Sequence, residues 1–321
     1  MADQEIKLCM IGAGRHSSRN MYPYFHYLQD TRVVANADLE LEKAERIAAP
    51  FGIPRSYTDY REMLDKEKPD GVMVCVSKEF HAVAAVDIML RGFHVYTEKP
   101  PAESVESVRK VLETQRETGL ICMTGYKKHF APAYAKAREI IDSDGFGAPA
   151  LLTMIRTKGP GESDYLLQWG CHATDLMPFM FGPVARVSTF RTPGSTNAHS
   201  INMEFKNGAV GNLSVTDRPG GAIEEVTACG GGQMTVRVRN SIIMEAFRGD
   251  QPVAAHNPSF IASGHGHVEQ GFVGELQEFV AAIREGREPE SGIESSAHSM
   301  AVHDAAERSA ESGRPEDVEE L

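Results

Sequence analysis

Lys99 is the residue whose type and position point most directly to proton chemistry. It lies in the segment Glu98-Lys99-Pro100, directly after an apolar run at residues 94–97 that predicts a buried strand. A lysine in a cleft can change its pKa, transfer a proton or hydrogen-bond a carbonyl oxygen. An isolated lysine beside prolines is more often an exposed loop residue, so the interpretation depends on what surrounds it.

A histidine and an aspartate, His172 and Asp175, form the second candidate pair. They interrupt an apolar, helix-like run at residues 166–176 and are three positions apart. Residues at this spacing share one face of a helix, where a carboxylate can orient an imidazole for acid/base work. The alternative is a histidine packed at the boundary of the core.

A glycine-rich turn, GAGRHS at residues 12–17, follows the apolar run 6–11 and matches GxGxxG except that Ser17 takes the place of the third glycine. Gly12 permits a tight turn, and Gly14 lets a pyrophosphate approach the backbone at the start of the next helix. Asp38 ends the second apolar run, 21 positions after Ser17, where a carboxylate accepts hydrogen bonds from ribose hydroxyls and repels a 2′-phosphate. The pattern predicts a dinucleotide site that favours NAD over NADP. The alternative is an ordinary turn followed by a helix-capping aspartate.

Continuous apolar runs alternate with amphipathic helical segments in the first part of the chain. This alternation predicts a doubly wound parallel sheet, a Rossmann fold, over residues 1–125. Strands are expected at 6–11, 32–37, 71–76, 94–97 and 121–124, and helices near 18–29, 41–51, 60–66, 81–91 and 104–118. The carboxyl ends of parallel strands meet at one edge, so the Gly12 turn, Asp38 and Lys99 should face the same crevice.

Residues 126–321 have a different pattern, which predicts a second, α+β domain with an open, mostly antiparallel sheet. The expected strands are 150–157, 186–192, 201–205, 210–216 and 234–239, and Asn207-Gly208 between two of them is a hairpin signal. A helical stripe at 272–283 ends at Gly286, and a last helix begins near residue 295. The acidic tail after Gly313 is expected to fray.

The composition excludes several classes of protein. A chain of 321 residues is expected to form two domains, and 33 basic against 45 acidic side chains give a net charge of −12, which argues against nucleic acid or anionic membranes as partners. No apolar stretch approaches a membrane span and no signal-peptide pattern opens the chain, so we expect a cytoplasmic protein. The five cysteines are scattered, and His265 and His267 have no Cys, Asp or Glu at ligand spacing, so neither disulfides nor a metal site are expected.

Six motifs follow one another along the chain: GAGRHS at 12–17, AD at 37–38, His81, EKP at 98–100, GYKKHFAPAY at 125–134 and WGCHATDL at 169–176. In this order they resemble the glucose-fructose oxidoreductase and inositol dehydrogenase family (Gfo/Idh/MocA) over essentially the whole chain. The resemblance implies that the first domain binds a nicotinamide dinucleotide and that Lys99 and His172 are the catalytic pair. It also implies that the second domain closes a sugar site and forms a homo-oligomer, a dimer or tetramer, through its sheet.

The same resemblance implies further site residues. For the cofactor these are Gly12, Gly14, Arg15, His16, Asp38, Ser77, His81, Glu98, Lys99 and Pro100, and for the substrate Gln168, Asp175, Lys127, Tyr165 and Trp169. Gln168 replaces the aspartate that the family usually has four positions before the histidine, so this position can hydrogen-bond but cannot ionise. His129 stands where the family usually has an arginine.

These features predict an NAD-dependent oxidoreductase that transfers hydride between nicotinamide and a secondary alcohol or ketone of a sugar, inositol or related polyol, with Lys99 and His172 handling the proton. A second hypothesis is a redox-neutral enzyme that modifies a sugar by elimination or hydrolysis and recycles a tightly bound NAD. A third, motivated by Gln168, is a non-catalytic sensor that binds NAD.

Overall fold

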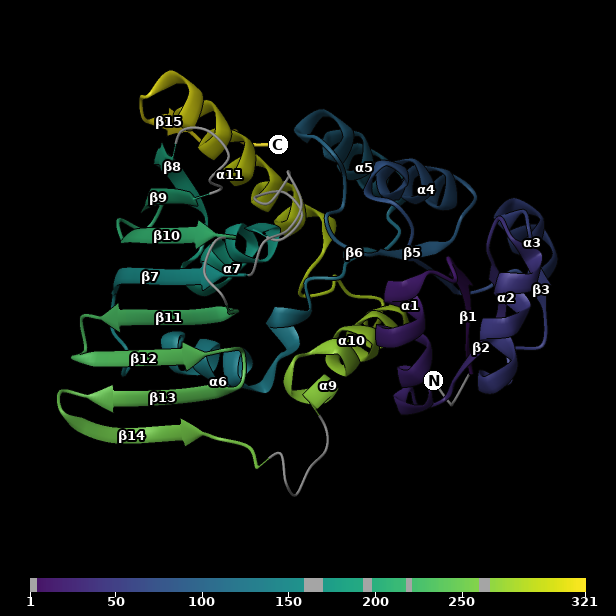
Figure 1. Cartoon of the computed structure of the whole chain (residues 1–321), viewed down its shortest axis with the longest axis horizontal. Coiled ribbons are helices and arrows are strands. Elements are labelled where there is room, and N and C mark those ends of the chain that lie inside the picture. The colour runs from purple at the N-terminus through teal and green to yellow at the C-terminus, as the bar shows by residue number, and fades with distance from the viewer. Residues whose placement is uncertain (1–4, 159–169, 193–197, 218–220, 260–265) are drawn as a thin grey trace. The chain divides into compact units, whose positions relative to one another are not determined.

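The computed structural model describes residues 5–158, 170–192, 198–217, 221–259 and 266–321, and the chain divides into two compact units (Figure 1). The first contains residues 1–126 and 272–297, and the second contains residues 127–271 and 298–321. The division predicted from the sequence placed all of 126–321 in the second domain. The structure differs because the helix α10 (Phe272–Glu285) packs its apolar stripe on the first sheet, where Phe279 lies against Tyr96.

The first unit contains a six-stranded sheet in which every neighbouring pair is parallel. In spatial order its strands are β3 (Ser56–Tyr57), β2 (Thr31–Ala37), β1 (Ile6–Ile11), β4 (Gly71–Val74), β5 (His94–Thr97) and β6 (Cys122–Thr124). The order 3-2-1-4-5-6 is that of a Rossmann fold, and the order of the strands reverses between β1 and β4. The predicted doubly wound fold is therefore confirmed.

Helices cover both faces of this sheet. They are α1 (Arg15–Asn20), α2 (Leu41–Ala48), α3 (Tyr60–Glu67), α4 (Lys78–Leu90), α5 (Val105–Thr118) and α10, with 3₁₀-helices η1 (Tyr22–Tyr27) and η2 (Ala49–Phe51). Figure 1 shows α4 and α5 side by side on one face and α10 on the other. The single helix expected at 18–29 is instead the short α1 followed by η1, because Pro23 has no N–H to continue an α-helix.

The second unit contains a nine-stranded sheet that is antiparallel except for the pair β7 and β10. Its strands in spatial order are β14 (Gln251–His256), β13 (Ile243–Arg248), β12 (Met234–Arg239), β11 (Ile223–Gly230), β7 (Pro149–Thr157), β10 (Val210–Thr216), β9 (Ala198–Phe205), β8 (Val184–Arg191) and β15 (Glu316–Asp317). The predicted α+β domain with a mostly antiparallel sheet is confirmed, as is the hairpin at Asn207-Gly208, where Gly208 has a φ of 88°.

One face of the second sheet is covered by α6 (Pro132–Ile141), α7 (Cys171–Phe181) and part of α11 (Ile293–Ser312), whose apolar side chains form one core with those of the strands. The 3₁₀-helix η3 (Lys127–Phe130) precedes α6, and a short α9 (Gly266–Glu269) belongs to the same unit. The C-terminal tail does not fray as expected: it forms β15 on the edge strand β8. Arg186 pairs with Asp317 at 2.7 Å, and the N–H of Val318 donates to the carbonyl of Ala185.

The described ranges of the chain bear on two kinds of binding, to a membrane and to a metal. None of the helices in these ranges is both long and apolar enough to cross a bilayer. Over the same ranges, no group of three His, Cys, Asp or Glu side chains is placed to hold a metal ion.

Candidate functional site

The turn after β1 contains two glycines, Gly12 and Gly14, with different surroundings. Gly12 has a φ of +104°, and a Cβ there would lie 2.1 Å from the carbonyl oxygen of Cys75, so only glycine allows β1 and the end of β4 to approach this closely. A Cβ at Gly14 would meet nothing within 4 Å. Gly14 therefore leaves open space beside the backbone at the point where a bound phosphate group would approach.

Asp38 follows β2 at the same edge of the sheet. Its Oδ2 accepts a hydrogen bond from the N–H of Ala13 at 2.8 Å, and its Oδ1 accepts one from the N–H of Glu40 at 3.2 Å. The ammonium group of Lys43 lies 3.4 Å from Oδ1. These contacts fix the carboxylate beside the glycine turn. Its oxygens have further lone pairs that can accept hydrogen bonds from ribose hydroxyls.

A cavity of about 690 Å³ opens in the first unit between these two features. Its wall includes the predicted residues Gly12, Gly14, Arg15, His16, Asp38 and Ser77, together with Leu39, Glu40, Lys43, Thr58, Tyr60 and Phe80. The volume lies in the range of roughly 300–1,000 Å³ that is usual for ligand sites. The open side of Gly14 and the acceptor oxygens of Asp38 suit a dinucleotide, so the residues present fit NAD.

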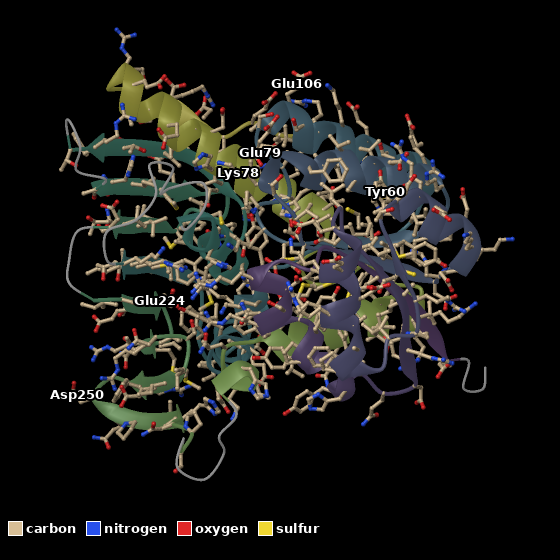
Figure 2. All side chains as sticks on the ribbon, turned by 45° about the vertical axis from the view of Figure 1, so that its right-hand side comes forward. Tyr60, Lys78, Glu79, Glu106, Glu224 and Asp250 are labelled. Carbon is tan, nitrogen blue, oxygen red and sulfur yellow. The ribbon has the colours of Figure 1, made fainter. Side chains whose placement is uncertain are left out.

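Two aromatic residues of this wall were not predicted. Tyr60, labelled in Figure 2, and Phe80 lie edge to face with ring centroids 6.1 Å apart. Tyr60 comes three residues after β3, and Phe80 comes in the first turns of α4, after β4. Both follow the carboxyl end of a strand, which is the sequence signal that could have identified them.

The loop after β5 holds a buried carboxylate beside Lys99. Glu98 accepts hydrogen bonds from His16 Nε2 at 3.1 Å and from the backbone N–H of Lys99 at 3.2 Å. Burial alone would raise the pKa of Glu98, but His16 and Lys99 outweigh burial and lower it to about 2. Glu98 is therefore an anion that connects the glycine turn to the lysine loop.

A second contact holds the same loop. His81, buried in α4, lies with Nδ1 2.8 Å from the carbonyl oxygen of Pro100, and the Lys99–Pro100 peptide bond is cis. Burial lowers the pKa of His81, so the ring is neutral and its Nδ1–H donates to that carbonyl. The structure thus brings His81, Glu98 and Pro100 together around Lys99.

The second unit places His172 in the first turn of α7, where it is buried. Asp175 was predicted to orient substrate or His172. In the structure its Oδ2 accepts a hydrogen bond from His129 Nε2 at 2.8 Å, and its Oδ1 accepts one from Ser299 at 3.1 Å. His129 lies 46 positions before Asp175 in the chain, so helical spacing alone does not reveal this partner.

The remaining substrate positions are divided between described and undescribed residues. Lys127 donates to Gln270 Oε1 at 3.3 Å. Tyr165, Gln168 and Trp169 lie outside the described residues.

A buried ionic cluster in the second unit was not predicted. Lys128 contacts both carboxylate oxygens of Glu224, a residue of β11 labelled in Figure 2, and donates to Ser241 at 2.8 Å. Tyr134 donates to Glu224 at 2.9 Å, and Arg156 lies 3.3 Å from it. Burial would raise the pKa of Glu224, but the two cations outweigh burial and hold it well below its ordinary value. The cluster joins η3, α6, β7 and β11.

Comparisons with known proteins agree with this arrangement. Residues 6–126 match the sequence model of an oxidoreductase family with an NAD-binding Rossmann fold. The chain is 27% identical over 313 residues to a 4-carboxy-2-hydroxymuconate-6-semialdehyde dehydrogenase of Sphingobium sp., covering 90% of this chain and 93% of the relative. It is 24% identical to a scyllo-inositol 2-dehydrogenase (NAD(+)) of Bacillus subtilis, covering 89% of each.

The fold is also similar to that of solved structures. A levoglucosan dehydrogenase in complex with NADH superposes with a TM-score of 0.87 at 18% identity, covering 98% of this chain and all of that one. The strand order, the glycine turn and the matches to related sequences support the Gfo/Idh/MocA oxidoreductase family, whose sequence model, with an NAD-binding Rossmann fold, matches residues 6–126.

Proposed function

We propose that the chain is an NAD-dependent oxidoreductase acting on a secondary alcohol, or the corresponding ketone, of a sugar, inositol or related polyol. The observation that carries the proposal is the position of Lys99. It follows β5 at the same edge of the parallel sheet at which the Gly12 turn and Asp38 line the cavity. Bound NAD supplies the hydride acceptor or donor, and the protein supplies orientation and proton transfer.

The residues around Lys99 give it a defined place. Glu98 and His81 hold the two sides of its loop through the contacts described above. A lysine held at such an edge can take the hydroxyl proton of an alcohol or donate one to a carbonyl oxygen. We assign the second proton-handling role to His172, which the family motif supplies.

The substrate class rests on the relatives. The name of the Bacillus subtilis relative specifies an inositol and NAD, and the matching structure is that of a dehydrogenase of levoglucosan. The Sphingobium relative is named for a semialdehyde, so a substrate panel should test polyols, aldoses and uronic acids beside an aldehyde.

The decisive experiment is Lys99→Ala. We expect turnover to fall by a factor of at least about 100, the usual contribution of a general acid or base, while NAD still binds in the cavity. Turnover is measured by the absorbance of NADH on the substrate panel, and NAD binding by calorimetry. His172→Ala should also reduce turnover without loss of NAD binding.

Lys110→Ala is a matched control, because this lysine on α5 is exposed and its ammonium nitrogen lies 3.4 Å from Glu106, which Figure 2 labels. Unchanged turnover in Lys99→Ala would contradict the role of Lys99. Conversion of a sugar with no net NADH would identify the redox-neutral alternative, and NAD binding without any reduction on the panel would identify a sensor.

We also propose that the protein is a homo-oligomer that associates through the second sheet. The face of that sheet opposite α6 and α7 carries the exposed apolar side chains Leu151, Ile155, Phe190 and Val210. Exposed apolar side chains on one face of a sheet favour an association surface.

A further inference from the structure

Arg156 lies on the covered face of β7, near the end of the strand. Leu152 and Met154 on this face belong to the core of the second unit, and Arg156 is the next residue in the same alternation. Its neighbours across the sheet are Glu224 on β11 and Val215 on β10. The Arg156 side chain is only 11% exposed. A guanidinium group buried to this extent, with five N–H donors, requires acceptors.

The carboxylate beside Arg156 is already occupied by other donors. Glu224 accepts two hydrogen bonds from Lys128, one from Tyr134 at 2.9 Å and one from Ser241 at 2.6 Å. A carboxylate has about four lone-pair positions, so these contacts fill it. Arg156 Nη1 lies 3.3 Å from Glu224 Oε2 but is buried without a hydrogen-bond partner among the described residues. The guanidinium group is therefore placed to bind an acceptor from outside the cluster.

The charge of the cluster specifies the kind of acceptor. When Lys128 is protonated, it and Arg156 carry two positive charges against the single negative charge of Glu224. The pKa of Lys128 is lowered to about 7, first by burial and then by the charge of Arg156, although Glu224 opposes the change. A second anion would stabilise both cations. One carboxylate balances the cluster, whereas a phosphate, with close to two negative charges, would exceed the balance.

The cluster adjoins the proposed catalytic histidine within the second unit. Lys128 is next in sequence to His129, whose Nε2 lies 2.8 Å from Asp175 Oδ2 on α7. Asp175 is three residues, about one helical turn, after His172. Both η3, which carries Lys128, and β7, which carries Arg156, pack against α7. The position for an anion is thus built on the elements that surround the helix of His172.

We infer that Arg156 is a specificity-determining residue that binds a carboxylate of the substrate, so that the alcohol belongs to a sugar acid such as a uronate rather than to a neutral polyol. A planar guanidinium group can donate two parallel hydrogen bonds to a carboxylate. The inference rests on the proposed function, because it names the substrate class of that reaction. It adds no step to hydride or proton transfer.

The test compares sugars that differ in one group: D-glucuronate with D-glucose, and D-galacturonate with D-galactose. In at least one pair, we expect the wild type to have a kcat/KM at least about tenfold higher for the acid. Arg156→Gln should raise KM for that acid about 10- to 100-fold at nearly unchanged kcat, as for loss of hydrogen bonds to a charged group. KM for the neutral sugar should change less than about twofold. Arg156→Lys keeps the charge but not the fork of donors, so its KM for the acid should lie between.

Arg239→Gln is the matched control. Arg239 on β12 of the same sheet also lies 3.3 Å from a carboxylate, that of Glu245, but its side chain is 49% exposed. This variant should keep the wild-type KM for both members of each pair. Equal losses on the acid and the neutral sugar in both Arg156 variants, or a wild type that prefers the neutral sugars, would overturn the role of Arg156.

Two further measurements separate the alternatives. Faster turnover of D-glucose 6-phosphate than of either acid would overturn the choice of a carboxylate. If none of these sugars yields NADH, the proposed function fails, and calorimetry with D-glucuronate and D-galacturonate then tests the anion site by itself. Binding of an acid to the wild type and not to Arg156→Gln would support the site, and equal binding or none would overturn it.

Discussion

At the scale of single residues, the contact between His16 and Glu98 links two loops that bear on the proposed chemistry. The amide of Asn20 donates to His16 Nδ1 at 3.2 Å, so Nε2 is the ring nitrogen that donates to Glu98, at 3.1 Å. His16 lies on the cavity wall and Glu98 precedes Lys99. One imidazole therefore connects the dinucleotide turn with the lysine loop.

Replacing His16 by Ala should destabilise the fold at neutral pH. The buried carboxylate of Glu98 would lose a donor, which costs about 1–3 kcal/mol in the free energy of unfolding. His16→Gln, which keeps a donor, should lose less. Urea unfolding of the three proteins gives the comparison, and an equal loss in both variants would show that the hydrogen bond is not the cause.

The pH dependence supplies a second readout of the same change. Folding lowers the pKa of Glu98 from 4.5 to about 2, so between these values the native state binds fewer protons than the unfolded chain. The stabilisation is complete above pH 4.5 and is lost as the pH falls through about 2. We therefore expect the gap between wild type and His16→Ala to narrow as the pH falls from 4.5 toward 2.

Only part of the site follows from local sequence. Gly12 and Asp38 come directly after strands, and Lys99 comes two residues after β5, so the strand pattern and the rule that carboxyl ends share one edge are enough to group them. Glu98 and His16 are 82 positions apart. Such contacts depend on how loops close and which side chains are buried, and no periodicity in the sequence records either.

At the scale of elements, α10 shows how a distant segment completes the Rossmann unit. A Cβ at Gly71 would lie 2.7 Å from Ile283 and 3.0 Å from Phe279, so β4 has no side chain where the helix crosses it. Phe279 is fully buried and its ring centroid lies 5.9 Å from that of Tyr96. The helix fills the face that Gly71 leaves free.

Phe279→Ala should therefore destabilise the protein by about 3–5 kcal/mol, the usual cost of removing a buried aromatic ring. Val83→Ala on α4 is the control, because Val83 is 54% exposed and its loss should change stability by no more than about 0.5 kcal/mol. Urea unfolding measures both. A loss of less than about 1 kcal/mol in Phe279→Ala would mean that α10 is not part of the stable core of this unit.

The elements that the sequence predicts well are those with one clear period. The bounds expected for β1, β5, β10 and β12 are those observed, because continuous or alternating apolar runs define them. The two-residue strands β3 and β15 are too short for any period, and β14 is an edge strand without fully buried positions. The sequence of α10 predicts a helix but not which sheet it covers, since an apolar stripe fits either core.

At the scale of the whole molecule, the face of the second sheet opposite α6 and α7 is the surface through which we propose that copies of the chain associate. Along the register, Leu151 on β7 is directly opposite Val210 on β10. Ile155 is opposite Ser214 on β10. The same row across the sheet goes on to Ser200 on β9 and ends at Phe190 on β8. An open face of an antiparallel sheet is normally polar, so apolar residues on neighbouring strands favour contact with another protein surface.

Ile155→Glu tests whether this face joins copies of the chain. Ile155 is half exposed in β7, the middle strand of the sheet, so a carboxylate there can stay hydrated in a free subunit but would be desolvated against a partner. We expect light scattering after size-exclusion chromatography to give a multiple of the chain mass for the wild type and a smaller species for the variant.

Val83→Glu, an equal change on an exposed position of α4, should leave the mass unchanged. NAD binding should survive in Ile155→Glu, because its cavity lies entirely in the other unit. A wild type that is monomeric at all concentrations, or a variant with the wild-type mass, would contradict association through this face.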